Sequence, residues 1–530
     1  SNATYFTWGD LDAKEIQKFI DKKLNKKFKK IDESKIEIVS EQKSFSEPVN
    51  VNEFFNPVSK EQTGYQNYCA WTLGESFNID QLLDAHLISL LLLSNSASPL
   101  YKVLESNGLG KSPAQILGLE DSMRHLVFIC GIEGTEPKSQ LKFNELVDKT
   151  FKNIVKDGFS DAQIDAALYQ LEMGKREISS GSLPYGLQIL LSMAPGSLYK
   201  SDPLILASVD EALNRLKERV KGKGYLNKLV DDLFISNNHR VNLEMVPDLD
   251  LINKKEAELK KILDSIKSSM SSKEKLDLIN DSKKLADRQN AIPDKNVLPK
   301  LELSDVPQST SYPKTKKLKT FGYSPTFYEQ HTNGLTYNAV TKDLNISSGE
   351  ELGHLMALTA LFGKVGVQKR DYFQLQEEIS RITGGINTSN HFYYDEKDQI
   401  KGKISLSSKF LPENTVEATE LIFEILNETK LDDEKRIKEL MFQNFMGFQQ
   451  SIVENGHRFA MLGASSSHSE LSFVQEAIGG LSAINRFVPF ISNQDDQIKD
   501  QMQKMQKMLQ KTKSDKNELL FISNIKLTNE

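Results

Sequence analysis

The chain has 530 residues and a formal net charge of -6, and its composition is 38% hydrophobic and 26% charged. At about 150 residues per domain, this length predicts about two to four globular domains, and the composition excludes the fibrous and disordered classes. The charge gives no broad basic surface, and the best apolar run, Leu87–Leu93, is far shorter than the ~18 residues of a membrane span. We therefore expect neither nucleic acid nor a membrane as a partner.

The first half of the chain contains a repeat unit at residues 65–245. Apolar residues spaced three and four apart predict helices, and short apolar runs bounded by turn residues predict strands. In chain order we predict a strand at Tyr65–Leu73, helices at Ile79–Ser94 and Ser98–Gly110, a strand at His125–Ile132, helices at Lys138–Asp157, Ser160–Ile178 and Leu183–Met193, and a closing strand at Arg240–Met245. Gly158 is expected to cap one helix, since glycine readily takes the left-handed conformation.

A second repeat unit, residues 335–525, has the same order of elements. We predict a strand at Leu335–Lys342, helices at Ser348–Gly363 and Tyr372–Gly385, a strand at Lys401–Ser407, helices at Asn414–Thr429, Asp432–Val453 and Gly456–Ser467, and a closing strand at Glu518–Ile525. The matching order predicts two copies of one α+β fold, each a mostly antiparallel sheet with helices packed on one face.

The segment between the two units is charged and helix-forming. Lys254–Met270 and Ser272–Asn290 each carry one narrow apolar stripe, which predicts an antiparallel helical hairpin with a mostly solvated face. The prolines that follow predict an extended linker, because proline resists helices and central strands; they are Pro293, Pro299, Pro307 and Pro313. We interpret the lysine cluster in this linker as part of a solvated tether: Lys314, Lys316, Lys317 and Lys319.

The chain has two cysteines, Cys69 and Cys130, which are too few for a disulfide framework. Both stand in apolar, strand-like runs, so we expect two buried free thiols in a reducing compartment. The first three residues, Ser1-Asn2-Ala3, resemble the remnant of an expression tag, which would hide any targeting signal.

Familiar catalytic patterns do not occur in the sequence. There is no H-E-x-x-H or H-x-x-E-H zinc motif, no Walker loop, no G-x-G-x-x-G and no G-x-S-x-G. A serine–histidine nucleophile pair could be drawn from His457, His468 and the serines at 465–467, although exposed residues at helix ends are the simpler interpretation. We therefore predict no catalytic residue and no metal ligand set, and the residues that would bind substrate stay unknown.

Two histidines occupy corresponding positions in the two units. His86 lies in the first long helix of one unit, and His354 lies in the first helix of the other. Each stands where an H-x-x-E-H motif would begin, but the glutamate and the second histidine are missing. Hydrolytic zinc needs about three protein ligands, so one imidazole cannot hold it. Both are interpreted as degenerate positions.

From Thr4 to Ile525 the chain resembles the pitrilysin-type zinc metallopeptidases, in the branch of presequence protease, falcilysin and insulinase-like enzymes. Order and spacing carry the resemblance rather than any single motif. The segments concerned are Ser98–Gly110, Asn333–Tyr337, Ile382–Ser389, Ser451–Ser469 and the central helical hairpin. Thr4–Leu11 resembles the last strand and helix entry of that family's first domain.

The resemblance implies an internal fragment of four homologous domains that close around a chamber. Residues 1–50 would be the tail of the first, catalytic domain with a linker, and 51–250 the second domain. Residues 251–292 would be the hairpin hinge, 293–325 the linker, and 326–530 the third domain. Zinc would belong to the parent protein and not to this fragment, which we predict to be inactive alone.

The same resemblance implies partners and a location. The partners would be unstructured peptides, such as targeting presequences, and the remaining domains of the same polypeptide. Mitochondrion, plastid or vacuole are suggested by the family alone. One alternative is a non-catalytic scaffold subunit of a larger complex, against which the charged hairpin argues. Another is a helical interaction module that uses Gln497–Lys511, whose Met502, Met505 and Met508 more simply form a core-facing stripe.

Overall fold

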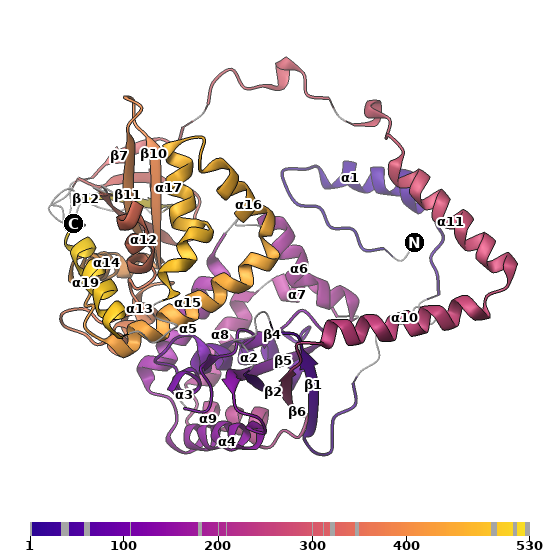
Figure 1. The fold of residues 1–530 in the computed structure, drawn as a ribbon, viewed down its shortest axis with the longest axis horizontal. Coiled ribbons are helices and arrows are strands. Elements are labelled where there is room, and N and C mark those ends of the chain that lie inside the picture. Colours follow the sequence, from indigo (N-terminus) through magenta and orange to yellow (C-terminus); the bar gives the residue numbers. More distant parts are fainter. Residues whose placement is uncertain are drawn as a thin grey trace.

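The computed structural model describes residues 3–32, 42–57, 64–106, 108–178, 183–199, 201–207, 209–298, 300–310, 312–318, 324–344, 349–488, 495–511 and 517–524. Two six-stranded sheets lie in two separate bodies, which Figure 1 shows side by side with a pair of helices projecting from them. Each sheet has its own cluster of buried apolar residues. We use first unit and second unit for these two bodies.

The sheet of the first unit has the order β1-β6-β2-β5-β3, and β4 also pairs with β5. Its strands are β1 (Val49–Phe55), β2 (Tyr65–Glu75), β3 (Ser112–Pro113), β4 (Gly118–Glu120), β5 (His125–Thr135) and β6 (Arg240–Pro247). Only the β1–β6 pair is parallel among these pairings. Its helices are α2 (Ile79–Leu93), α3 (Pro99–Ser106), α4 (Gln140–Asp157), α5 (Asp161–Arg176), α6 (Tyr185–Leu198), α7 (Pro203–Ala207), α8 (Val209–Val220), α9 (Tyr225–Val230) and the π-helical turn η3 (Asp231–Ile235).

The sheet of the second unit has the order β10-β11-β9-β12-β8-β7. Its strands are β7 (Thr315–Lys317), β8 (Thr326–Glu329), β9 (Thr336–Leu344), β10 (Ile386–Tyr394), β11 (Ile400–Phe410) and β12 (Asn517–Ser523). Its helices are α12 (Gly349–Thr359), α13 (Tyr372–Ile382), α14 (Thr415–Glu428), α15 (Glu434–Glu454), α16 (Gly456–Ser465), α17 (Glu470–Gly479) and α19 (Asp495–Lys511), with 3-10 turns η6 (Pro412–Asn414) and η7 (Leu481–Arg486).

The two sheets share one topology. In the first unit, β1 runs parallel to the closing strand β6, which is antiparallel to β2, which is antiparallel to β5. In the second unit, β8, β12, β9 and β11 repeat these pairings in the same order and with the same directions. The predicted α+β fold with two similar, mostly antiparallel sheets is therefore confirmed. The exact domain boundaries stay a prediction.

The core of the first unit forms where inward-facing residues of β2 and β5 meet the helices. Trp71 on β2 is fully buried, and its indole N–H donates to the Phe234 carbonyl oxygen at 3.2 Å. The Phe234 ring packs edge-on against Trp71 and stacks on Phe151 with 4.4 Å between ring centroids. Such aromatic clusters bury a large apolar area while each polar N–H keeps a partner, so they fix the sheet against its helices.

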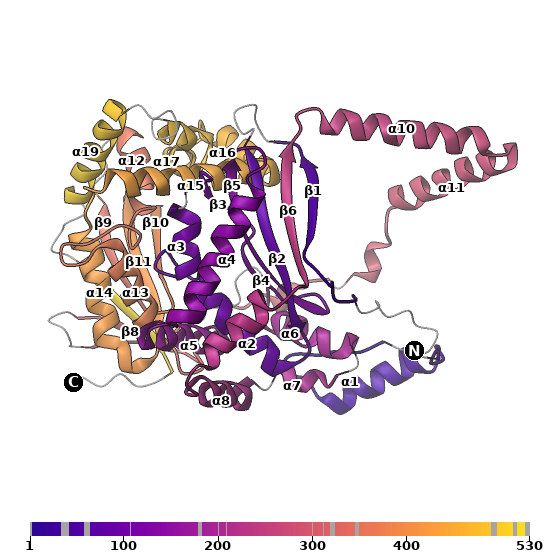
Figure 2. The same cartoon turned by 90° about the horizontal axis from the view of Figure 1, so that it is seen from below.

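The two central helices are present where the sequence predicts them. They are α10 (Leu251–Ser269) and α11 (Ser272–Asn290), and Ser271 caps α11 with a reciprocal hydrogen-bonded box to Glu274. Their apolar stripes face solvent, since Leu263 and Ile279 are both more than half exposed. Figures 1 and 2 show the two helices diverging from the break between them, so their stripes are not packed on each other here.

Several expected elements differ in the structure. Residues 4–8 form no strand, because no neighbouring strand within the described ranges pairs with them; instead α1 (Ala13–Ile20) begins after the capping residue Asp12 and continues into the π-helical turn η1 (Asp21–Asn25). The proline-containing linker includes short 3-10 turns, η4 (Lys295–Val297) and η5 (Leu303–Asp305), and ends in β7, which pairs with β8. Part of the expected tether is therefore sheet.

Other differences concern boundaries and omissions. The predicted helix at Leu183–Met193 continues to Leu198, and α7, α8, α9 and β10 have no counterpart in the prediction. The predicted methionine stripe is confirmed, because Met505 and Met508 are buried in the core of the second unit and Met502 packs against it. The expected helix start at Ser348, the last residue of the closing strand, Ile525, and Lys319 lie outside the described residues.

The two units meet through matching helices. The helix α5 of the first unit packs against α13 of the second, and the start of α15 reaches α3. Since α3 and α13 hold the same place in their units, as do α5 and α15, the interface is approximately two-fold. Buried contacts hold it: the Tyr169 hydroxyl donates to the Ile382 carbonyl oxygen at 3.1 Å and accepts from the Leu411 N–H at 2.9 Å.

A buried ion pair anchors the other half of this interface. Arg436 on α15 lies 3.2 Å from the Glu105 carboxylate and donates to Ser96 Oγ at 2.9 Å, and the side chains of Arg436 and Glu105 are only 4% and 7% exposed. The guanidinium also stacks 4.4 Å from the Tyr372 ring centroid. Burial raises the pKa of Tyr372 to about 12. These groups leave water only because each finds a partner in the opposite unit.

Candidate functional site

The two histidines predicted to be degenerate zinc positions lie on corresponding helices. His86 is on α2, where its Nε2 lies 3.1 Å from Asp121 Oδ2, and that hydrogen bond holds the pKa of Asp121 below its ordinary value. Lys175 stands close enough to Asp121 to interact electrostatically, and burial lowers the pKa of this lysine. An imidazole already bonded to a nearby carboxylate, with an ammonium group beside that carboxylate, is a poor ligand set for zinc.

His354 lies on α12 and is only 4% exposed. Its helix neighbours Leu355 and Leu358 belong to the core of the second unit, and the position of the second histidine in an H-x-x-E-H motif is this Leu358. Zinc, which the family resemblance implies for the parent protein, therefore does not fit either position. Within the described ranges, no group of three or more histidine, cysteine or acidic side chains could hold a metal ion.

The serine-rich stretch does not assemble a nucleophile. Ser465 Oγ donates to the Leu462 carbonyl oxygen at 3.1 Å, and Ser466 Oγ donates to the Gly463 carbonyl oxygen at 2.7 Å. These hydroxyl groups close helix turns instead of facing His457 or His468. The sequence analysis missed a serine–histidine contact on β10, where Ser389 Oγ lies 2.9 Å from His391 Nε2. That pair is exposed, and within the described residues no carboxylate hydrogen bond orients its imidazole.

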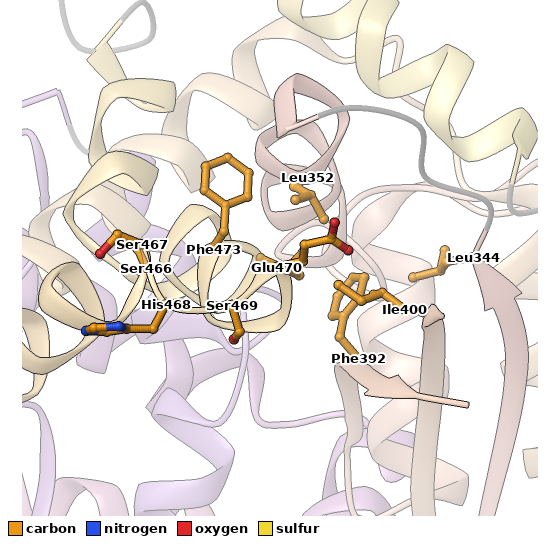
Figure 3. A pocket seen from close by; sticks show the side chains of 12 residues that line it. Leu344, Leu352, Phe392, Ile400, Ser466, Ser467, His468, Ser469, Glu470 and Phe473 are labelled. Carbon is orange, nitrogen blue, oxygen red and sulfur yellow. The ribbon is translucent and has the colours of Figure 1, made fainter. Parts of the chain in front are cut away.

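A cavity of about 650 Å³ lies at one end of the second sheet, beside this stretch. Figure 3 shows its walls: Phe392 and Ile400 come from the strands, and Leu352 comes from α12. Phe473 and Glu470 close it from α17, whose N-cap is Ser469. Apolar walls with a few polar groups at the rim are typical of a pocket that takes an apolar side chain.

The two cysteines form a buried pair in the first unit. Cys69 on β2 stands directly opposite Cys130 on β5, and both are fully buried, as predicted. Arg240 lies with a guanidinium nitrogen 3.3 Å from Cys69 Sγ and donates to Asp148 at 2.6 Å. Burial disfavours both thiolates, but the Cys130 thiol and the Arg240 charge lower the pKa of Cys69, whereas burial and Cys69 raise the pKa of Cys130.

Comparison with known proteins gives this arrangement a family. The profile described as "Peptidase M16 inactive domain" matches residues 1–171, and the profile of the region associated with subfamily C of the M16 peptidases matches residues 245–488. The chain is 27% identical over 521 residues to Protein HypA of Clostridium perfringens, covering 96% of this chain and 53% of that protein. It is 27% identical over 456 residues to Presequence protease 1, chloroplastic/mitochondrial, of Arabidopsis thaliana, covering 83% of this chain and 42% of that protein.

These matches define a chain of the metallopeptidase class built from domains without the zinc motif. The chain belongs to the pitrilysin-type M16 peptidase family, as the sequence resemblance predicted. It spans about half the length of the curated relatives it matches. The crystal structure of pitrilysin covers 98% of this chain at 12% identity, with 50% of that structure covered and a TM-score of 0.39, which is too low to support any statement about arrangement. None of the described helices is long and apolar enough to cross a bilayer.

Proposed function

We propose that this chain forms the non-catalytic central part of a zinc-dependent, presequence-protease-like oligopeptidase that degrades unstructured peptides in a closed chamber. The observation that carries the proposal is the pair of units with one topology, in which the helix that would bear a zinc motif keeps one histidine and lacks the other ligands. Such units supply walls and binding surface, while zinc and the remaining domains belong to the parent protein.

The central helices support a hinge role in this proposal. Their connection to both units runs through exposed chain, and every residue from 252 to 269 on α10 and every residue of α11 is exposed. Segments with few buried contacts are those that can change orientation at low cost, which a chamber needs in order to open. Relatives named as mitochondrial or chloroplastic presequence proteases support an organellar location, which is part of the proposal.

The test uses the purified chain, a fluorogenic unstructured peptide and zinc. We expect no turnover and less than stoichiometric zinc after dialysis, measured by elemental analysis, together with measurable peptide binding by fluorescence anisotropy. A folded small protein of similar length is the control and is expected not to bind. Chelator-sensitive turnover by the chain alone would overturn the proposal, and so would the lack of any peptide binding.

A further inference from the structure

The outer edge of the second sheet is unusual among the sheet edges of this protein. The edge strand β10 has nine residues, its sequence INTSNHFYY has no proline and no Asp, Glu, Lys or Arg, and its pairing with β11 runs without a register shift. The other edges are protected: β7 is three residues long with two lysines, β3 ends in Pro113, and β1 carries Glu53. Short length, charge and proline are the usual devices that stop an edge from pairing, and β10 has none of them.

The backbone of β10 is available on its outer side. In an antiparallel ladder, the N–H and C=O groups of alternate residues point to opposite sides, so pairing with β11 satisfies only one side of the strand. Within the described residues, no backbone hydrogen bond from another element reaches residues 386–394 on the outer side. A flat row of donors and acceptors of this length is complementary to one ligand type, an extended polypeptide.

The cavity of about 650 Å³ continues this edge at its Tyr394 end. Phe392, the third-last residue of β10, is part of the cavity wall, and Phe473 of α17 forms the facing wall. The helix is held there by the Leu471 N–H, which lies 3.4 Å from the Tyr394 hydroxyl oxygen. An extended chain paired along β10 would therefore bring a side chain to this apolar space.

We propose that the outer edge of β10 binds an extended polypeptide segment as an added strand, with one apolar side chain of that segment seated in the cavity beside α17. A second copy of this chain is a poorer occupant, because α17 lies against the Tyr394 end of β10 and leaves access for a single strand rather than for a whole sheet. The inference rests on the proposed function, since it names where the non-catalytic part holds an unstructured peptide.

The chemistry of this site predicts its selectivity. Main-chain hydrogen bonds read no sequence, and the cavity asks only for one apolar side chain, so the site would accept many unstructured peptides. Folded proteins would be excluded because their strands are already paired. This tolerance is what a surface for diverse short peptides requires.

The test compares peptide affinities of the full chain by fluorescence anisotropy, with a labelled unstructured peptide that contains one leucine. The variant Asn387→Lys/His391→Lys places two charges on exposed positions of β10 and is expected to weaken binding at least about tenfold, since edge lysines oppose strand pairing. Asn280→Lys/Gln289→Lys adds the same charge on exposed positions of α11 and is expected to leave affinity unchanged.

A second variant tests the cavity. Phe473→Ser removes a half-exposed ring, so it should not disturb folding, and it is expected to weaken the leucine peptide about tenfold but not a peptide with glycine in place of leucine. Equal affinity of the wild type and both the β10 and Phe473 variants would overturn this inference while leaving the proposed function intact. No binding by the wild type would overturn both. Self-association that the β10 variant abolishes, with unchanged peptide affinity, would show that the edge pairs with a second copy instead.

Discussion

The buried Arg436–Glu105 ion pair gives the sharpest test of how the two units are coupled. Replacing Arg436 with Met would leave the Glu105 carboxylate, only 7% exposed, without its 3.2 Å partner inside the interface. Removing one member of such a pair costs about 3–5 kcal/mol, whereas replacing both members costs less. We therefore expect Arg436→Met to destabilise the chain by about this amount, and Arg436→Met/Glu105→Gln to recover a large part of it.

The assay is urea unfolding followed by two signals. Trp71 is the only buried tryptophan and lies in the first unit, so fluorescence reports that unit, while far-ultraviolet circular dichroism reports both units. In the wild type the buried interface is expected to keep the two transitions together, and Arg436→Met should separate them. The control Arg288→Met changes an exposed arginine on α11 and should change stability by less than about 0.5 kcal/mol.

The refuting result is defined by the double-mutant cycle. If the effects of Arg436→Met and Glu105→Gln add within about 0.5 kcal/mol, the two side chains do not interact in solution and the interface is held elsewhere. Coincident transitions in every variant would likewise contradict the role assigned to this pair.

Three further predictions concern the first unit. Gly131→Ala should be strongly destabilising in thermal melts, because its Cβ would lie 2.5 Å from the Tyr68 ring, whereas Gly174→Ala in the open middle of α5 should stabilise by up to about 1 kcal/mol. Burial opposes ionisation of Glu172, but hydrogen bonds from a lysine and an arginine lower its pKa; its stabilisation is complete above the ordinary value of about 4.3 and lost as the pH falls below it, so Glu172→Gln should flatten the acid limb of a stability–pH curve. Burial raises the pKa of Glu133, so that carboxyl destabilises as the pH rises through its unfolded pKa, and Glu133→Gln should have the opposite effect on the slope. Both buried cysteines should resist a thiol reagent in the native chain and react after denaturation, and rapid labelling of the native chain would contradict their burial.

Sequence periodicity predicted the elements that are buried on one face. The β2 and β5 strands and helices such as α4 and α5 were predicted within a few residues, because their buried sides impose the spacing and their ends carry local signals. Ser160 and Gly158 show this directly, since one forms a capping box and the other ends its helix at φ +75°. The strand β10 was missed because an edge strand is covered on little of its surface, so its sequence INTSNHFYY shows no clear alternation.

By itself, the sequence determined the two similar units, the helical pair between them and the absence of a zinc motif, since each follows from local pattern and from residue types along the chain. Only the tertiary structure decided that β10 is an open edge beside a cavity, that Cys69 faces Cys130, and that Arg436 is buried against Glu105 of the other unit. These features join residues tens to hundreds of positions apart. No local pattern encodes such contacts, because they depend on how the sheets are ordered and how the helices of one unit pack on the other.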